Sequence, residues 1–256
     1  MSSIDLRHAG RAFACACLAV AALAGGRAAA AEFNLNPTRV ELDKARSIET
    51  LVLGNADARP LSFEVSVKRW TMAADGSWQL QPSDELVVHP LVFTVQPGAQ
   101  ARLRVGTLDP DTGAERAYRI ELQQLPDAQA DDGVAVALLT RISVPVFVQT
   151  RAPQARAALA GGSLRADGLH LVLANTGDRY LPPQDARLRV LDAAGRVLDD
   201  SSITTGYVLA GARLPLPVHA VTAAVCARAE RVELQLPEAG GTVVAPLPAG
   251  DRQCGG

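Results

Sequence analysis

One segment, residues 134–148, constrains the fold more than any other part of the chain. Branched aliphatic side chains occupy every second position except Thr140, namely Val134, Val136, Leu138, Ile142, Val144, Val146 and Val148. Because successive side chains of a strand point to opposite faces, the pattern predicts one continuous aliphatic ridge. At about 3.3 Å per residue the strand would reach roughly 50 Å, over twice the usual length of about 5–6 residues. Such a strand either serves two domains or is partly meant for another protein.

The first residues have the pattern of a secretory signal peptide. A positive start with Arg7 and Arg11 precedes the apolar run 12–24, and small residues lead to an Ala-x-Ala site at 29–31. We expect cleavage before Glu32. About 13 apolar residues are fewer than the roughly 20 that span a bilayer. The pattern therefore predicts an exported protein without membrane insertion.

Composition and turn signals favour an all-β protein of two domains. Removal of residues 1–31 leaves a chain long enough for two units, and a stretch rich in Ala, Gly, Arg and Pro predicts a hinge at 151–162 between domains at 32–150 and 163–256. Short strand-like runs separated by turn residues indicate an immunoglobulin-like β-sandwich in each. These runs lie at 39–42, 49–53, 61–70, 86–95, 101–105, 117–122, 169–174, 186–191, 196–198, 207–208, 213–218 and 231–236.

Two cysteines remain once Cys15 and Cys17 leave with the signal peptide. In an exported chain, Cys226 and Cys254 most simply pair as a disulfide. Such a bridge would stabilise the fold by about 3.5 kcal/mol on the chain-entropy model. Two free redox-active thiols are the alternative, but the Cys-x-x-Cys spacing is missing.

The residues give little indication of catalysis, cofactors or nucleic acid. His89, His170 and His219 each stand alone in strand-like runs, without metal-ligand spacing. No phosphate loop or nucleophile elbow is present. The net charge of −2 and pI near 6.1 argue against a nucleic-acid partner. We therefore expect a protein that is not an enzyme and needs no cofactor or metal.

Several motifs, in order along the chain, resemble one family. They are Asn-Pro-Thr-Arg-Val at 36–40, Leu-Ser-Phe-Glu-Val at 61–65 with Trp70, the run from Pro90 to Gly98, the run from Glu115 to Leu122 with Leu125-Pro126, Val-Leu-Ala-Asn-Thr-Gly at 172–177 and Gly-Tyr-Val-Leu at 206–209. Together they are similar to periplasmic pilus-assembly chaperones of the PapD type. The resemblance implies two immunoglobulin-like domains in an L-shaped arrangement.

The resemblance also gives the long strand a role. It would be the last strand, G1, of the first domain, lent to a pilus subunit that lacks its own final strand. Val134, Val136, Leu138 and Thr140 are the expected donors, whereas the aliphatics from Ile142 to Val148 would fill the chaperone's own core. Pro145 cannot donate a ladder hydrogen bond, so it is expected beyond the donor section.

A cationic anchor for the subunit's C-terminal carboxylate is implied as well. Arg39 matches the family's arginine, and its guanidinium suits a carboxylate. The family's lysine on G1 falls on Ser143. Arg141 or Arg104 would then supply the second charge, or the anchoring is weaker; an ordinary solvated arginine is equally consistent with either.

At Arg119, Glu121 and 126–127 the chain departs from the residues common in well-studied members of the family. Together with Ser-Val-Pro-Val-Phe at 143–147, these residues resemble the archaic or spore-coat-U-related branch. The implied partners are pilus or coat-type subunits and an outer-membrane usher, without ATP. Self-association through the G1 edge stays open. The alternative is an exported β-sandwich binding module or a structural adhesion component; a carbohydrate-binding module is disfavoured because only 4% of residues are aromatic.

Overall fold

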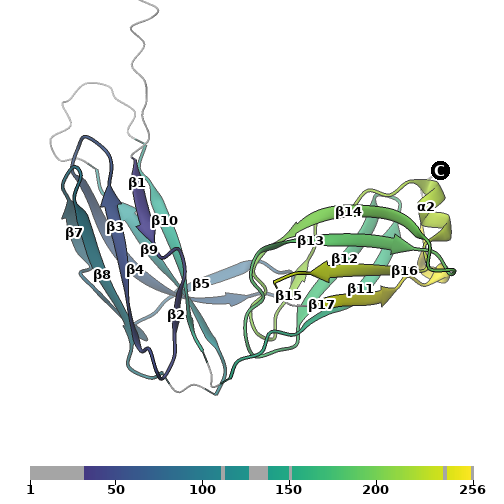
Figure 1. The fold of residues 1–256 in the computed structure, drawn as a ribbon, viewed down its shortest axis with the longest axis horizontal. Coiled ribbons are helices and arrows are strands. Elements are labelled where there is room, and N and C mark those ends of the chain that lie inside the picture. The colour runs from purple at the N-terminus through teal and green to yellow at the C-terminus, as the bar shows by residue number, and fades with distance from the viewer. Residues whose placement is uncertain (1–31, 111–112, 127–137, 150–151, 239–240, 255–256) are drawn as a thin grey trace, which may run out of the picture.

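The computed structural model describes residues 32–110, 113–126, 138–149, 152–238 and 241–254, and the predicted signal peptide lies outside these ranges. Two β-sandwiches meet at an angle to form an L (Figure 1). The predicted all-β class with two immunoglobulin-like sandwiches is confirmed. Within the described ranges, no helix has the length and apolar character needed to cross a bilayer.

The first sandwich packs a four-stranded sheet against a larger one. The first sheet contains β1 (Phe33–Asn36), β3 (Ile48–Asn55), β8 (Gln100–Thr107) and β6 (Leu86–His89), in that order. The larger sheet runs in the order β2 (Val40–Leu42), β10 (Arg141–Val148), β9 (Arg116–Gln124), β4 (Leu61–Met72) and β5 (Trp78–Pro82), with β7 (Val92–Val95) also paired to β4. The predicted run 86–95 divides into β6 and β7 around Pro90, which has no N–H for the ladder.

The aliphatic ridge of β10 enters the first core, as predicted. Val144, Val146 and Val148 are at most 1% exposed, and Ile142 packs against the same cluster. The strand begins later than expected, however, at Arg141. Its partner β9 ends at Gln124, which bonds to Thr140, so residues 138 and 139 have no β9 residue with which to extend the ladder. Val134 and Val136 lie outside the described residues.

The second sandwich also has two sheets, and the structure adds strands to those predicted. One sheet runs β11 (Ala157–Arg165), β12 (Gly168–Asn175) and β15 (Arg213–Pro215). The other runs β14 (Val197–Thr205), β13 (Gln184–Leu191), β16 (Arg231–Leu236) and β17 (Gly241–Pro246). The additions include β11, whose Ala and Gly residues have low strand propensity. β11 begins inside the range predicted as a hinge, so residues 157–162 lie in a strand.

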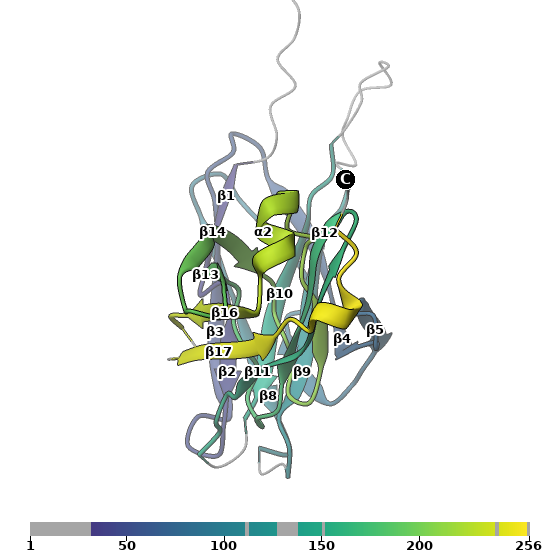
Figure 2. The same cartoon turned by 90° about the vertical axis from the view of Figure 1, so that its right-hand side faces the viewer.

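The predicted disulfide joins Cys226 and Cys254, whose Cα atoms are 5.7 Å apart. Cys226 lies on the short helix α2 (Ala223–Arg228), and Cys254 follows a 3₁₀ turn at Ala249–Asp251. α2 lies at the end of the second sandwich remote from the first (Figures 1 and 2). The bridge therefore fixes the C-terminal segment far from the junction of the two sandwiches.

A small core of its own holds the sandwiches together. Its buried members are Trp70, Ala117, Phe147, Tyr180 and Leu209, contributed by both sandwiches. Tyr180 also donates its hydroxyl to Glu41, and its backbone N–H donates to Glu115 Oε1 at 2.8 Å. The junction thus combines apolar burial with hydrogen bonds to two carboxylates.

Candidate functional site

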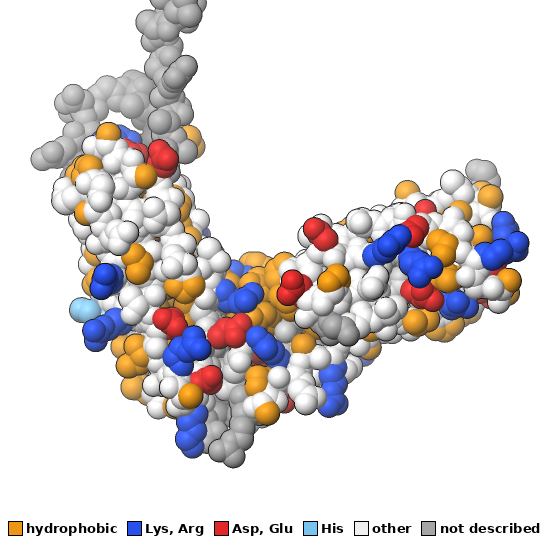
Figure 3. Space-filling view, in the orientation of Figure 1, with side chains coloured by type: hydrophobic (Ala, Val, Ile, Leu, Met, Phe, Trp, Pro, Cys, Tyr) orange, Lys and Arg blue, Asp and Glu red, His pale blue; other side chains and the backbone are white. Residues whose placement is uncertain are grey.

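The outer face of the larger sheet of the first sandwich looks into the angle of the L, here called the crook. Across this face a row of cations follows the strand register. Val40 pairs with Val146, so Arg39 lies beside Pro145. Pro145 in turn pairs with Arg119 on β9, and Arg119 pairs with Lys68 on β4. The row therefore consists of Arg39, Arg119 and Lys68. Figure 3 shows basic and apolar side chains side by side in the crook.

Arg119 is the most unusual member of the row because its side chain is buried. The residue is 4% exposed, and its Cζ atom lies 4.0 Å from the ring centroid of Trp70, 4.2 Å from that of Trp78 and 5.5 Å from that of Tyr207. Nη1 approaches the Ser143 carbonyl at 3.5 Å, a long contact. Nε and Nη2 have no hydrogen-bond partner among the described residues. Burial lowers the pKa of Arg119 to about 10, so the group stays charged at neutral pH.

Arg39, the predicted anchor, lies on the crook face with 43% of its side chain exposed. Its Nε atom is 3.2 Å from Glu41 Oε1, and its guanidinium lies 5.7 Å from the Tyr180 ring centroid. Glu41 in turn accepts from Arg179 of the second sandwich at 3.2 and 3.3 Å. Arg39 is therefore accessible but already paired with a carboxylate of its own chain.

The two alternatives for the second cation have different positions. Arg141 opens β10 on the same face as Ser143, is exposed, and donates from Nε to Gln123 Oε1 at 2.7 Å. Arg104 lies on β8, in the opposite sheet, between the buried residues Leu103 and Val105. Because strand side chains alternate, Arg104 points away from the first core on the far side of the sandwich. The structure does not bring it together with Arg39.

The described donor residues lie just before β10. Leu138 is 63% exposed, so its side chain is free of the first core. Thr140 is half-buried; its carbonyl accepts from the Gln124 N–H at 2.9 Å, and its N–H donates to Gln124 Oε1 at 3.1 Å. The other two expected donors, Val134 and Val136, fall in the undescribed range 127–137.

β10 has an open edge beside these residues. The bond from Gln124 N–H to the Thr140 carbonyl means that even-numbered residues bond to β9, and odd-numbered residues direct their backbone groups to the other side. On that side, β2 covers only Val146–Val148. Among the described residues no strand covers the edge from Arg141 to Val144, and the N–H groups of Arg141 and Ser143 point to this open side.

One other constellation resembles a catalytic site but fails on geometry. His219, Asp199 and Ser201 come together in the second sandwich, although the histidines were expected to stand alone. Both Asp199 and Ser201 approach the same ring nitrogen, Nε2, at 2.9 and 3.4 Å. A Ser-His-acid relay needs the acid and the serine on opposite ring nitrogens, so this cluster cannot act as one. Within the described residues, no group of three or more His, Cys, Asp or Glu side chains is arranged to hold a metal.

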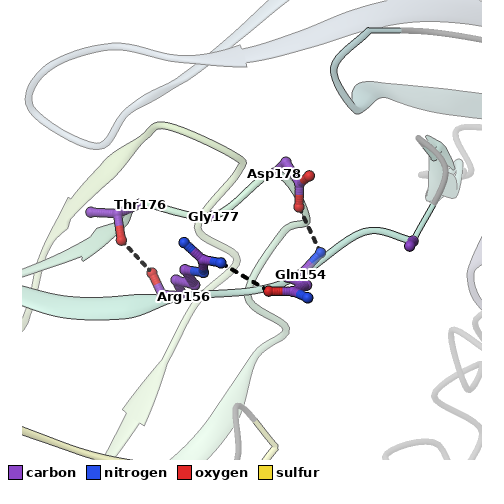
Figure 4. A pocket seen from close by; sticks show the side chains of 6 residues that line it. Gln154, Arg156, Thr176, Gly177 and Asp178 are labelled. Carbon is purple, nitrogen blue, oxygen red and sulfur yellow. Dashed lines mark hydrogen bonds between the residues drawn. The ribbon is translucent and has the colours of Figure 1, made fainter.

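A shallow pocket lies where the second sandwich begins (Figure 4). The Gln154 N–H donates to Asp178 at 2.6 Å, Arg156 donates to the Gln154 side chain at 3.0 Å, and Thr176 donates to the Arg156 carbonyl at 3.3 Å. These mutual bonds use the polar groups that line the pocket.

Sequence reasoning missed the surroundings of Arg119, although it noted the residue as a departure from the family pattern. Trp70 and Trp78 are 8 positions apart and pack together through the β4–β5 pairing, with ring centroids 4.8 Å apart. Tyr207 belongs to the second sandwich. An arginine that interrupts the buried residues Ala117, Tyr118 and Ile120 is the one local signal of this site.

Comparison with known proteins supports the resemblance over the first sandwich. Residues 32–154 match the family "Pili and flagellar-assembly chaperone, PapD N-terminal domain". No curated protein matches the chain in sequence.

Solved structures share the fold over most of the chain. The complex of the Salmonella enterica SafA pilin with the SafB chaperone matches with 17% identity over 86% of this chain and 98% of that chain, at a TM-score of 0.55. The Acinetobacter baumannii CsuC–CsuE chaperone–tip subunit complex, from archaic chaperone–usher pili, matches with 18% identity over 85% and 98% at 0.53. The E. coli chaperone DraB matches with 20% identity over 85% and 97% at 0.50. At these identities the likeness shows a common two-domain β-sandwich fold.

Proposed function

We propose that this protein is a periplasmic chaperone for pilus or coat-type subunits. It would bind a subunit that lacks its final strand and deliver it to an outer-membrane usher, without catalysis or ATP. The family match over residues 32–154 supports this assignment, and two of the structurally similar proteins are complexes of a chaperone with a subunit. The archaic branch is the proposed subclass, supported by the likeness to the Csu complex.

The observation that carries the proposal is the open edge of β10. Its outward-facing backbone groups can form a ladder with the edge of a client, while Leu138 places an exposed aliphatic side chain beside it. The same strand buries Val144 and Val146 in the first core. The strand therefore has two adjoining parts, one packed in the first core and one whose edge is open.

Arg39 is the proposed anchor for the client's terminal carboxylate. Its guanidinium lies on the crook face beside Pro145, where the open edge ends. An incoming carboxylate would replace Glu41 in the pair with Arg39. The register of the client strand on β10 would follow from this fixed point.

The proposal includes the division into domains and the compartment. We place the first domain at 32–149, the connection at 150–156 and the second domain from β11 onward, because residues 157–162 belong to that strand. The signal-peptide pattern of residues 1–31 supports export to the periplasm. Two copies would be able to cap each other through the same edge when no client is present.

A charge on the donor segment tests the function. Leu138→Asp places a carboxylate on the ridge that would enter the client's groove, so capture should fall by about tenfold or more, the effect of burying an unpaired charge. The control is Val244→Asp, since Val244 is 54% exposed on β17 of the second sandwich. Each variant is co-expressed in the periplasm with a pilin-like subunit that the wild-type protein captures, and recovered complex is measured. Undiminished complex with Leu138→Asp would overturn the donor role.

A further inference from the structure

We propose that the β4–β5 hairpin is a stop that limits how far the two sandwiches close around the crook. The hairpin reaches out of the first sandwich, and its tip at Gly76 lies against Leu214 and Pro215 of β15. The inference concerns the free chain and does not depend on the proposed function. It assigns the part of the fold that sets the smallest angle of the L.

The hairpin is long for the sheet from which it starts. β4 has 12 residues, about twice the usual length of a strand, and its register with β9 ends at Arg69. From Trp70 onward its partner is β5, a strand whose residues are all exposed. In Figure 1 the hairpin crosses the inner side of the angle and ends at the second sandwich. Closure of the crook would therefore press its tip against β15.

The tip is a closed turn with a defined conformation. The Ala73 N–H donates to the Ser77 carbonyl at 2.9 Å, and the Gly76 N–H donates to the Ala73 carbonyl at 3.0 Å. The Ser77 N–H donates to Asp75 Oδ1 at 2.9 Å. Gly76 has a φ of +81°, a conformation that glycine adopts without steric cost. These bonds make the tip a firm end to the hairpin.

The tip touches the second sandwich through steric contact. Gly76 is buried, although Asp75 and Ser77 on either side of it are exposed. A Cβ atom at Gly76 would lie 2.8 Å from Pro215 Cδ and 3.1 Å from Leu214 Cδ1, closer than the roughly 3.5–4.0 Å of an ordinary carbon–carbon contact. Among the described residues, no hydrogen bond or ion pair joins residues 73–77 to the second sandwich. Such a contact resists approach but not separation.

The base of the hairpin is held against the second sandwich as well. The Leu209 N–H donates to Met72 Sδ at 3.4 Å. The ring of Tyr207 meets that of Trp70 edge-on, with ring centroids 5.4 Å apart. Trp70 and Leu209 are both buried. The hairpin therefore cannot slide past β15 without loss of buried contacts, so pressure on the tip passes to the first sandwich.

The opposite edge of the same sheet carries contacts of the other kind. β2 and β5 are its two outer strands. On β2, Glu41 accepts from Arg179 at 3.2 and 3.3 Å and from the hydroxyl of Tyr180. Charge-assisted bonds of this kind resist separation of the sandwiches. Bonds that resist opening at one edge and a stop that resists closing at the other together fix the angle that any partner of both sandwiches must fit.

The distance between two nitroxide spin labels, one on each sandwich, tests the stop by pulsed electron paramagnetic resonance. Val87→Cys on β6 and Val244→Cys on β17 provide the label sites, because these side chains are 49% and 54% exposed. In the mature chain from residue 32 onward, Cys226 and Cys254 are bridged and take no label. The label distance lengthens when the angle of the L opens.

Gly76→Asn is the variant that should open the angle. Asparagine tolerates a positive φ, so the turn is retained, but its side chain needs room beside Pro215. We expect the mean distance to lengthen by at least about 1 Å, the gap between 2.8 Å and an ordinary contact. Gly98→Asn is the matched control, since Gly98 has a φ of +72° and open space where a Cβ atom would lie. No shift in Gly76→Asn, or an equal shift in Gly98→Asn, would overturn the proposal.

A second variant removes the other side of the contact. Pro215→Ala deletes the Cδ atom that meets the tip, and Pro215 is exposed, so the second core stays filled. The distance distribution should extend to shorter values. Combined with Gly76→Asn, it should cancel part of the lengthening, because residues in contact are coupled. Strictly additive shifts would show that the tip and β15 do not act through this contact.

The outcome is separate from that of the chaperone function, because none of these measurements requires a client. Undiminished client capture in Leu138→Asp would remove the donor-strand function and leave the stop standing. An unchanged label distance in Gly76→Asn would remove the stop and leave the donor-strand function untouched.

Discussion

Phe147 of β10 stacks on Tyr180 of the second sandwich, with ring centroids 3.7 Å apart and ring planes inclined by 14°. Val146 precedes Phe147 and Val148 follows it, and both valines lie in the first core. One strand therefore fills the core with one face and joins the two sandwiches with the other. The proposed donor strand is also the structural link that sets the crook.

Replacement of Phe147 tests that link. Phe147→Ala should lower the free energy of unfolding by about 3–5 kcal/mol, the usual cost of truncating a fully buried phenylalanine. Chemical denaturation measures it, and Phe147→Leu is the matched control with a smaller expected loss. A loss near zero for the alanine variant would mean that the stack contributes nothing to the junction.

Arg39→Ala should reduce recovery of the client complex by about tenfold or more, because a charge-assisted bond to the terminal carboxylate is lost. Quantitative recovery from the periplasm measures the effect. Arg46→Ala is the control: Arg46 is 65% exposed in its side chain and lies outside the crook strands, before β3. Equal recovery for the two variants would contradict the anchoring role of Arg39.

Arg119→Met should leave the stability of the free protein unchanged or raise it. The substitution removes a buried charge that has no ion pair among the described residues and keeps apolar contact with Trp70 and Trp78. Thermal unfolding in the absence of client measures the change. A fall of more than about 2 kcal/mol, the size of a strong cation–π contact, would indicate that Arg119 serves to hold the aromatic cluster together.

Glu115 gives the junction a pH dependence. Burial raises the pKa of its carboxyl group to about 8, although the hydrogen bond from the Tyr180 N–H favours the charged form. In the unfolded chain the group titrates near about 4.3, so between these values the folded state binds more protons than the unfolded state. Stability should therefore fall as the pH rises through this window, by a few kcal/mol at most.

Denaturation at about pH 5 and about pH 8.5 measures this dependence, and Glu115→Gln should remove most of it. Glu121→Gln, on the same face of β9 but half-exposed, should not. A wild-type protein that is more stable at the higher pH than at the lower one would contradict the assignment.

Removal of the disulfide should destabilise the second sandwich. The bridge closes a loop with a sequence separation of 28, and the chain-entropy model assigns about 3.5 kcal/mol to it. The double variant Cys226→Ser with Cys254→Ser should unfold at correspondingly lower denaturant concentration. Because the bridge lies far from the crook, recovery of the client complex should remain under conditions in which the variant stays folded.

The sequence by itself determined the properties that follow from local geometry. Alternation along 134–148 predicted that Val144, Val146 and Val148 enter the core, because successive side chains of any strand point to opposite faces. The cysteine count in a chain predicted to be exported predicted the bridge, and ordered motifs predicted two sandwiches. None of these required knowledge of which strands lie next to one another.

Only the tertiary structure decided which residues meet in the crook. Strand register put Arg119 beside Pro145, and the junction of the sandwiches brought Tyr207 to a corner already formed by Trp70 and Trp78. Sheet assignment likewise removed Arg104 from the candidates, since β8 belongs to the opposite sheet. Contacts of this kind depend on pairings between strands remote in sequence, and a periodic pattern along one strand carries no information about the strand beside it.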